Sequence, residues 1–163
     1  MAKPTRFTQE MMDGFLAQGH WHRETLADIC DRNARELPDR VAYADSKARI
    51  TWADLKQLSD RAALGLLGLG IKKDEVVLVQ LPNWVENVVL RMAFLKAGIL
   101  SIFPPMTWRQ AEMEHALKSL DGVAVVIPRR FRSVESFQMV QEIAPRLPSL
   151  RHTLVVGDDV PGG

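Results

Sequence analysis

The chain alternates short apolar runs with longer segments whose apolar residues recur at helical spacing, most clearly between residues 75 and 128. The runs are continuous and rich in β-branched residues, as expected of strands that are buried on both faces of a sheet. Helical crossovers between such strands make them parallel, and the crossovers are almost always right-handed. This unit is therefore predicted to be a parallel α/β sheet. Its strands are expected at residues 76–81, 99–103 and 123–127, and its helices at residues 84–97 and 107–121.

The same pattern predicts further elements on either side of this unit. Thr25 and Thr51 are each followed three residues later by aspartate, which is typical of a helix start whose first turn is capped by side chains. The flanking elements are predicted to be helices at residues 7–18, 25–36, 51–69 and 133–146, a hairpin at residues 41–51 and a strand at residues 153–156.

Together these elements predict an α/β fold of the Rossmann type, a mostly parallel sheet with helices on both faces, plus a short β-hairpin. We expect residues 1–22 to form a docking arm, residues 23–157 the Rossmann-like subdomain, and residues 158–163 a linker to further protein. Ligands of such sheets gather at the carboxyl ends of the strands. The segments expected there are residues 81–83, 103–107 and 127–130.

The helix predicted at residues 84–97 is apolar on nearly all sides, so it should be covered on more than one of them. Asn83 is predicted to cap its first turn. Its buried face is expected to consist of Val85, Val88, Val89, Met92 and Leu95.

Three tryptophans, Trp52, Trp84 and Trp108, each follow a predicted capping residue at the start of a helix. One interpretation is that these bulky rings simply cover loops. The alternative is that Trp84 and Trp108, both at the carboxyl edge of the sheet, anchor additional protein.

Composition excludes several classes of protein. A length of 163 residues, 47% hydrophobic and 25% charged, is typical of one ordinary globular domain with a real core. The net charge of +1 gives no basis for binding nucleic acid or an anionic membrane. No apolar run approaches the roughly 20 residues that cross a bilayer. Residues 1–6 are not followed by an apolar signal core, so a cytoplasmic location is expected.

The chain lacks the motifs that usually carry chemistry on such a sheet. It has no glycine-rich phosphate loop, no nucleophile elbow and no zinc-protease motif, so no catalytic residue is predicted. His20 and His22 have no third ligand nearby, and no metal site is predicted. The one cysteine, Cys30, excludes an internal disulfide and lies on an apolar helix stripe, where a buried thiol is expected rather than a reactive one.

A basic cluster of three residues, Arg129, Arg130 and Arg132, follows a predicted strand directly. Guanidinium groups at the carboxyl end of a strand could hold a phosphate through paired hydrogen bonds. The alternative interpretation is a solvated loop that keeps the protein soluble. The sequence leaves both open.

The central unit resembles the N-terminal region of the adenylate-forming acyl- and aryl-acid ligases. Residues 79–84 read Val-Gln-Leu-Pro-Asn-Trp, residues 94–98 read Phe-Leu-Lys-Ala-Gly, and a strand and Pro104-Pro105 follow. Residues 50–55, Ile-Thr-Trp-Ala-Asp-Leu, are similar to an early motif of that family, with tryptophan for the usual tyrosine and aspartate for the usual glutamate. The opening at residues 19–26 is similar to dihydroxybenzoate–AMP ligases and cyclohexanecarboxylate–CoA ligases.

The resemblance implies a two-step reaction in which a small carboxylic acid is activated by ATP and Mg²⁺ as an acyl adenylate and then passed to the thiol of coenzyme A. It places the phosphate loop and the catalytic lysine after residue 163, so the isolated chain is expected to be inactive and to hold no cofactor. The absent remainder of the ligase is expected to dock at Trp84 and Trp108. A homodimer is a further expected assembly.

The resemblance also implies contacts with coenzyme A, carried over to this sequence by position. Phe103, Pro104, Pro105 and Met106 stand where some relatives approach the coenzyme A arm, with prolines in place of glycines. Arg129, Arg130 or Arg132 falls near the place where relatives hold the nucleotide phosphate.

Two rival functions remain open. One is an aryl-acid–AMP ligase that loads a siderophore carrier protein instead of coenzyme A. The other, of a different class, is a stand-alone α/β module that binds a partner without chemistry.

Overall fold

The computed structural model describes residues 7–157, and its centre is a four-stranded, fully parallel sheet in the order β4-β3-β5-β6. The three central apolar runs therefore lie side by side and point the same way, as predicted. The hairpin is confirmed as a separate antiparallel pair, β1 with β2. The strands are β1 (Val41–Ala44), β2 (Arg49–Thr51), β3 (Val76–Val79), β4 (Leu100–Ile102), β5 (Ala124–Pro128) and β6 (His152–Val156).

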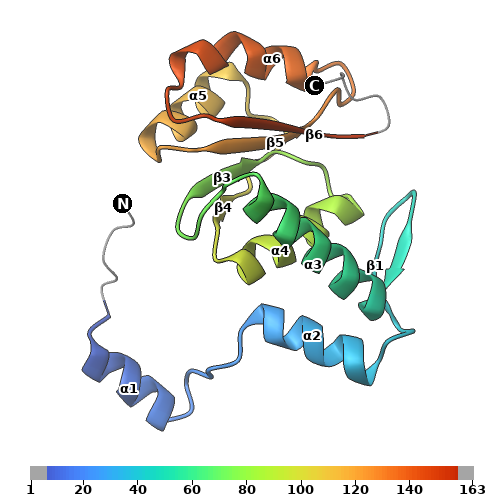
Figure 1. The fold of residues 1–163 in the computed structure, drawn as a ribbon, viewed down its shortest axis with the longest axis vertical. Helices are drawn as coiled ribbons and strands as arrows, with labels where there is room; N and C mark the ends of the chain where they lie inside the picture. The colour runs from blue at the N-terminus through green and yellow to red at the C-terminus, as the bar shows by residue number, and fades with distance from the viewer. Residues whose placement is uncertain (1–6, 158–163) are drawn as a thin grey trace.

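Helices cover both faces of this sheet (Figure 1), which confirms the predicted α/β class. One core lies between the sheet and the helices α3 and α4, around the fully buried Phe94. A second core lies on the opposite face under α5 and α6, around Met113 and Ile143. The helices are α1 (Gln9–Ala17), α2 (Leu26–Glu36), α3 (Trp52–Gly68), α4 (Val85–Ala97), α5 (Gln110–Ser119) and α6 (Ser136–Ile143), with a 3-10 turn η1 (Ala144–Arg146).

Both predicted threonine caps are confirmed. The hydroxyl of Thr25 accepts from the backbone N–H of Asp28, and the Asp28 carboxylate accepts from the backbone N–H of Thr25 in return. Thr51 and Asp54 make the same reciprocal pair at the start of α3. Each pair satisfies two donors that the helix itself leaves free.

The predicted start of α4 was wrong. Trp84 occupies the capping position with no side-chain cap, and the helix begins at Val85. The oxygen that Asn83 was expected to supply comes from Asp45 in the hairpin turn, whose Oδ2 accepts from the backbone N–H of Val85 at 2.8 Å. A partner 40 residues away replaces a local cap, and it ties the hairpin to the sheet domain.

The helix predicted from residue 107 also begins later. It starts at Gln110 after Arg109, whose backbone N–H donates to Glu112 Oε2 at 2.9 Å. Trp52 does open a helix, whereas Trp84 and Trp108 both precede theirs. The last predicted helix is shorter, because it starts at Ser136 and passes into η1 after Ile143.

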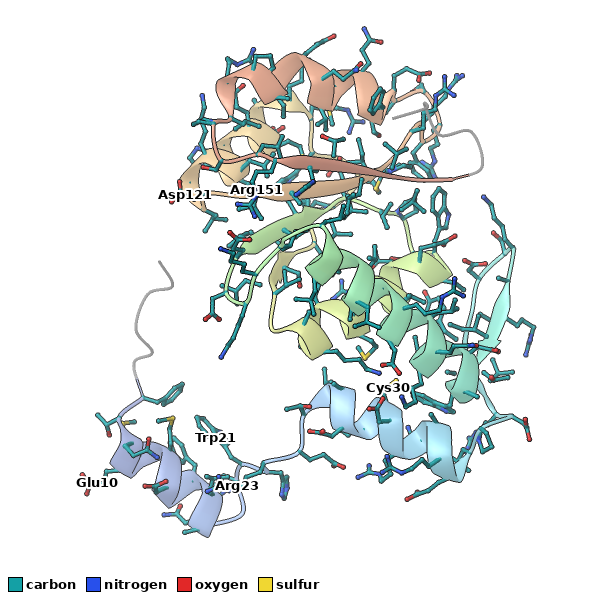
Figure 2. The ribbon with its side chains drawn as sticks, viewed as in Figure 1. Glu10, Trp21, Arg23, Cys30, Asp121 and Arg151 are labelled. Carbon is teal, nitrogen blue, oxygen red and sulfur yellow. The ribbon has the colours of Figure 1, made fainter. Side chains whose placement is uncertain are left out.

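Cys30 is buried in a third cluster formed by α2, α3, α4 and the hairpin (Figure 2). It is 1% exposed and unpaired, and burial raises the pKa of its thiol. The predicted structural role is therefore confirmed.

The N-terminal arm lies apart from the sheet, joined to α2 by an extended segment (Figure 1). No residue of α1 is buried, and its aromatic side chains pack on one another: the ring of Trp21 lies 5.1 Å from that of Phe7 and 5.0 Å from that of Phe15. Docking of this arm stays a prediction. The predicted linker at residues 158–163 lies outside the described residues. Within residues 7–157, no helix has the length and apolarity to cross a bilayer.

Candidate functional site

The order in which the chain adds strands to the sheet changes direction between the neighbouring strands β3 and β5, although all the strands are parallel. The chain leaves β3 for β4 on one side through α4, and then returns through α5 to β5 on the other side. Since α4 and α6 lie on opposite faces, the loops after β3 and β5, which lead to these two helices, diverge at this point. Such a switch point leaves a crevice beyond the carboxyl ends of the strands, where parallel sheets bind their ligands.

An open cleft of about 450 Å³ lies at this switch point. Its walls come from the loops after all three central strands and from the first turns of α4. The lining residues are Val79, Leu81, Pro82, Asn83, Asn87, Arg91, Phe103, Pro104, Pro105, Met106, Phe131 and Arg132.

Gln80 holds the loop between β4 and α5 against the sheet. Its side chain is 1% exposed, and its Nε2 donates to the carbonyl oxygens of Pro105 at 2.9 Å and Trp108 at 3.1 Å. The backbone N–H of Trp108 also donates to the Pro105 carbonyl at 3.1 Å. One buried amide therefore fixes the turn that carries the proline wall of the cleft.

Replacing Gln80 with leucine is expected to lower the free energy of unfolding by about 1 kcal/mol, because the two carbonyl groups lose a buried donor. The larger effect should be local. Hydrogen exchange at the Trp108 amide should speed up, while exchange at the β5 amides stays slow. Equal acceleration at Trp108 and in β5 would mean that Gln80 supports the whole sheet and not this loop.

A second side chain, Asn87, positions Arg91. Asn87 is 8% exposed, and its Nδ2 donates to the carbonyl oxygens of Leu81 and Pro82, both at 3.2 Å. Its Oδ1 is then free to accept from Arg91 Nε at 3.1 Å. The Arg91 guanidinium lies 3.7 Å from the centre of the Phe103 ring, a close cation–π contact. The backbone of the β3 loop thus orients a guanidinium over the β4 loop.

Two of the predicted arginines line a neighbouring hollow of about 350 Å³ instead of the cleft. Arg129 and Arg130 lie there with Lys47, Trp84 and Glu135. Arg130 pairs with Glu135 at 3.1 Å, and the ammonium of Lys47 lies 4.7 Å from the centre of the Trp84 ring.

The Trp84 ring meets Phe131 edge to face at 6.2 Å. This pair contributes one ring to the hollow and one to the cleft.

The sequence-predicted contacts are thus divided between two neighbouring depressions. Phe103, Pro104, Pro105, Met106 and Arg132 share the cleft, and Arg129 and Arg130 share the hollow beside it.

Residues 81–83, one of the segments expected at this edge of the sheet, do line the cleft, but the prediction overlooked Asn87 and Arg91 as members of it. Asn87 and Arg91 stand four residues apart on a helix that is otherwise mostly apolar. That spacing places two polar side chains on one helix face, and it could have identified them.

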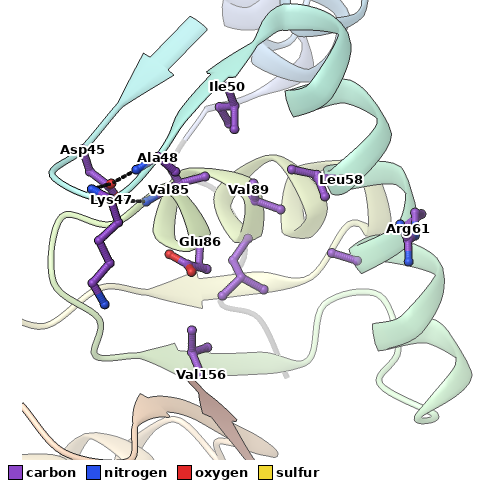
Figure 3. Close-up of a pocket in the computed structure, with 12 residues that line it drawn as sticks. Asp45, Lys47, Ala48, Ile50, Leu58, Arg61, Val85, Glu86, Val89 and Val156 are labelled. Atoms are coloured by element: carbon purple, nitrogen blue, oxygen red, sulfur yellow. Dashed lines mark hydrogen bonds between the residues drawn. The ribbon is translucent and has the colours of Figure 1, made fainter. Parts of the chain in front are cut away.

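A larger cavity, about 680 Å³, lies between the hairpin, α3, α4 and the end of β6 (Figure 3). Its walls are mainly apolar, among them Ile50, Leu58 and Val156, with charged residues at the rim. Asp45 stands at one end and accepts from the backbone N–H groups of Lys47, Ala48 and Val85 (the contacts to Lys47 and Val85 are 2.7 and 2.8 Å). These bonds, the one from Lys47 first, lower the pKa of the Asp45 carboxyl.

Trp84 and Trp108 are half-buried, and both have partners within the domain. Trp84 contacts Lys47 and Phe131, and Trp108 packs against the core under α5. Docking of further protein on them stays a prediction, as does a homodimer. Among residues 7–157, no group of three histidine, cysteine or acidic side chains could hold a metal ion.

Comparison with known proteins connects this fold to one family. A family model described as AMP-binding enzyme matches residues 30–162. A 2-hydroxy-7-methoxy-5-methyl-1-naphthoate–CoA ligase from Streptomyces carzinostaticus is 34% identical over 146 residues, 90% of this chain and 26% of the relative. A salicyl-AMP ligase / salicyl-S-ArCP synthetase from Mycobacterium tuberculosis is 33% identical over 160 residues, 95% of this chain and 28% of the relative.

Among solved structures, the apo structure of Mycobacterium smegmatis MbtA is 36% identical with a TM-score of 0.85, covering 94% of this chain and 28% of that one. The chain therefore spans about a quarter of the length of the relatives it matches. The resemblance drawn from the motifs is confirmed, and the fold is that of an N-terminal subdomain of the adenylate-forming ligases.

Proposed function

We propose that this chain, which belongs to the AMP-binding enzyme family, is the N-terminal portion of an AMP-forming acid–CoA ligase. In that reaction an aryl, alicyclic or fatty carboxylate attacks the α-phosphorus of ATP and releases pyrophosphate. The thiol of coenzyme A then attacks the acyl adenylate, and AMP leaves. The observation that carries the proposal is similarity to acid ligases over nearly the whole chain.

The contribution of this chain would be binding and orientation rather than bond making. The cleft at the switch point is lined by two arginines, and no aspartate or glutamate of the part of the chain that the structure describes lines it. This donor set suits the phosphates of coenzyme A, for which Phe103, Pro104, Pro105, Met106 and Arg132 would form the wall. Arg129 and Arg130 would meet the same ligand from the adjoining hollow. ATP and Mg²⁺ would be held by protein beyond this chain.

A second candidate is an aryl-acid–AMP ligase that delivers its product to a carrier protein. It is favoured by the 33% identity to the salicyl-AMP ligase and by the TM-score of 0.85 to MbtA. Product analysis separates the two candidates: the enzyme that contains this chain, supplied with ATP and an aryl acid, should acylate coenzyme A under the first proposal and a carrier protein under the second.

The proposal that residues 1–163 are only part of a ligase can be tested directly. The purified chain should show no acid-dependent exchange of pyrophosphate into ATP and form no acyl-CoA. A chain extended by the coding sequence that follows Gly163, where one exists, should show both. Exchange by the isolated chain would contradict the proposed division of labour. A stop codon directly after Gly163, together with absent exchange, would favour a non-catalytic binding module.

A further inference from the structure

We infer that Arg91 and Arg132 form a receptor for a phosphoryl anion, with Arg91 as its prepositioned member. The inference rests on the cleft alone and does not depend on the ligase reaction. The chemical class of the ligand is a phosphate or diphosphate group, whether free or part of a larger molecule.

The first step in the argument is that Arg91 is held before any ligand arrives. Its Nε is occupied by Asn87 Oδ1 at 3.1 Å, and the guanidinium plane is supported by Phe103 at 3.7 Å. Asn87 is itself held by two backbone carbonyl groups. A surface arginine usually loses much side-chain entropy when it binds an anion, and this one has already lost part of it.

The second step is that the binding end of Arg91 remains available. Among the residues that the structure describes, neither Nη1 nor Nη2 of Arg91 has a hydrogen-bond or ion-pair partner, and the residue lines the cleft. A guanidinium with both terminal nitrogens available presents the fork that fits two oxygens of one phosphoryl group.

The third step concerns the opposite wall. Arg132 lines the same cleft from the loop after β5, with its guanidinium carbon 5.3 Å from the centre of the Phe131 ring. Its backbone has a φ of 54° between Phe131 and Val134, which bond each other through both backbone N–H groups at 2.9 and 3.0 Å. The loop therefore turns sharply at Arg132, and its carbonyl oxygen accepts from Arg130 Nε at 3.0 Å.

The charge of the residues that line the cleft indicates an anionic ligand. Among residues 7–157, two positive residues line it, and no aspartate or glutamate does. Arg130, in contrast, is already paired with Glu135 in the neighbouring hollow. A volume of about 450 Å³ leaves room for a diphosphate and for a group attached to it.

The test is calorimetric titration of the 163-residue chain with inorganic pyrophosphate at low ionic strength, where screening is weak. Arg91→Met should weaken the affinity about tenfold or more, because it removes charge-assisted hydrogen bonds. Arg91→Lys keeps the charge but loses both the fork and the bond to Asn87, so it should recover only a small part of the affinity.

Arg61→Met is the matched control. Arg61 is also an exposed helical arginine, but it lies on α3 at the rim of the apolar cavity, so the same loss of charge should change the affinity by less than about twofold. Equal losses for the two methionine variants, or no pyrophosphate binding by the unsubstituted chain, would overturn the inference. Thermal melting of each variant confirms that it is folded.

A competition experiment identifies the source of the phosphoryl group. If the ligand is coenzyme A, it should displace pyrophosphate more strongly than 3′-dephospho-coenzyme A does, and Arg91→Met should remove the difference. If both displace equally weakly, the receptor takes a free or nucleotide diphosphate instead. Either result supports the inference that the cleft binds a phosphoryl anion, whereas only the first also supports the proposed ligase that uses coenzyme A.

Discussion

Replacing Phe94 with alanine is expected to lower the free energy of unfolding by about 3–5 kcal/mol, the range found when a buried aromatic residue is truncated to leave a cavity. Phe94 is 0% exposed and lies in the core between the sheet and the helices α3 and α4. Its ring also meets that of Phe103 edge to face, with the centres 6.4 Å apart. The substitution therefore removes packing from the core and from the wall of the cleft.

Leu95→Ala is the matched control for this prediction. Leu95 is the next residue of α4, but its side chain is 48% exposed, so truncation should cost less than about 1 kcal/mol. Urea unfolding followed by circular dichroism measures both. A loss at Leu95 as large as that at Phe94 would show that the outer face of α4 is covered in solution.

This pair of residues also shows what the pattern of apolar positions could not decide. The sequence correctly predicted that α4 needs cover on more than one side, and the helix does contribute to two cores. It placed Leu95 inside, where the structure puts Phe94 and Ala93. On a helix that is apolar nearly all round, periodicity carries little information about orientation, and packing against two layers decides it.

The direction of the strands and the start of α4 show that features set by neighbouring residues can be predicted, whereas features set by distant residues cannot. The parallel strands could be predicted because buried apolar runs and crossover helices are local features. The start of α4 could not, since the oxygen that caps it belongs to Asp45, 40 residues earlier. The candidate site followed this rule too: the loop segments 103–106 and 129–132 were found by their position after strands, and Arg91 was missed because its role depends on Asn87 and on a ring from another loop.

The helices α2, α3 and α4 are linked by one partly buried ammonium group, that of Lys96. Lys96 Nζ contacts Asp31 of α2 at 2.7 Å and Asp60 of α3 at 2.5 Å, and only 13% of the Lys96 side chain is exposed. Lys96 lies in the Leu-Lys-Ala-Gly motif from which the family resemblance was drawn. In this chain the lysine of that motif therefore has a structural role, because it links α4 to two other helices next to the buried Cys30.

Lys96→Met is expected to lower the free energy of unfolding by about 2 kcal/mol. This value lies between the cost of breaking a fully buried ion pair and the small value of an exposed one, because the partly exposed Asp31 and Asp60 regain some water. Lys56→Met is the control. Within residues 7–157 the Lys56 ammonium pairs with Asp60 alone, and 39% of its side chain is exposed, so its loss should cost less than about 1 kcal/mol.

The difference in the free energy of unfolding between the original chain and Lys96→Met should also depend on pH. Burial by itself would lower the pKa of Lys96, but its hydrogen bonds to Asp31 and Asp60 outweigh burial and raise that pKa above 10.5. Burial would raise the pKa of Asp60, but the bonds from Lys56 and Lys96 outweigh it and lower that pKa below 3.8. A carboxyl group whose pKa is lowered by folding stabilises the protein at pH values above its pKa in the unfolded chain. An ammonium group whose pKa is raised by folding stabilises the protein at pH values below its pKa in the unfolded chain.

The stability difference should therefore be constant between pH 3.8 and 10.5 and should shrink outside this range, through protonation of Asp60 on the acid side and deprotonation of Lys96 on the basic side. Urea unfolding at a series of pH values measures it. A difference that instead changes near neutral pH would assign the effect to a group other than these. A constant difference that persists below and above the range would mean that Lys96 stabilises the helices by packing its methylene chain, with little contribution from its charge.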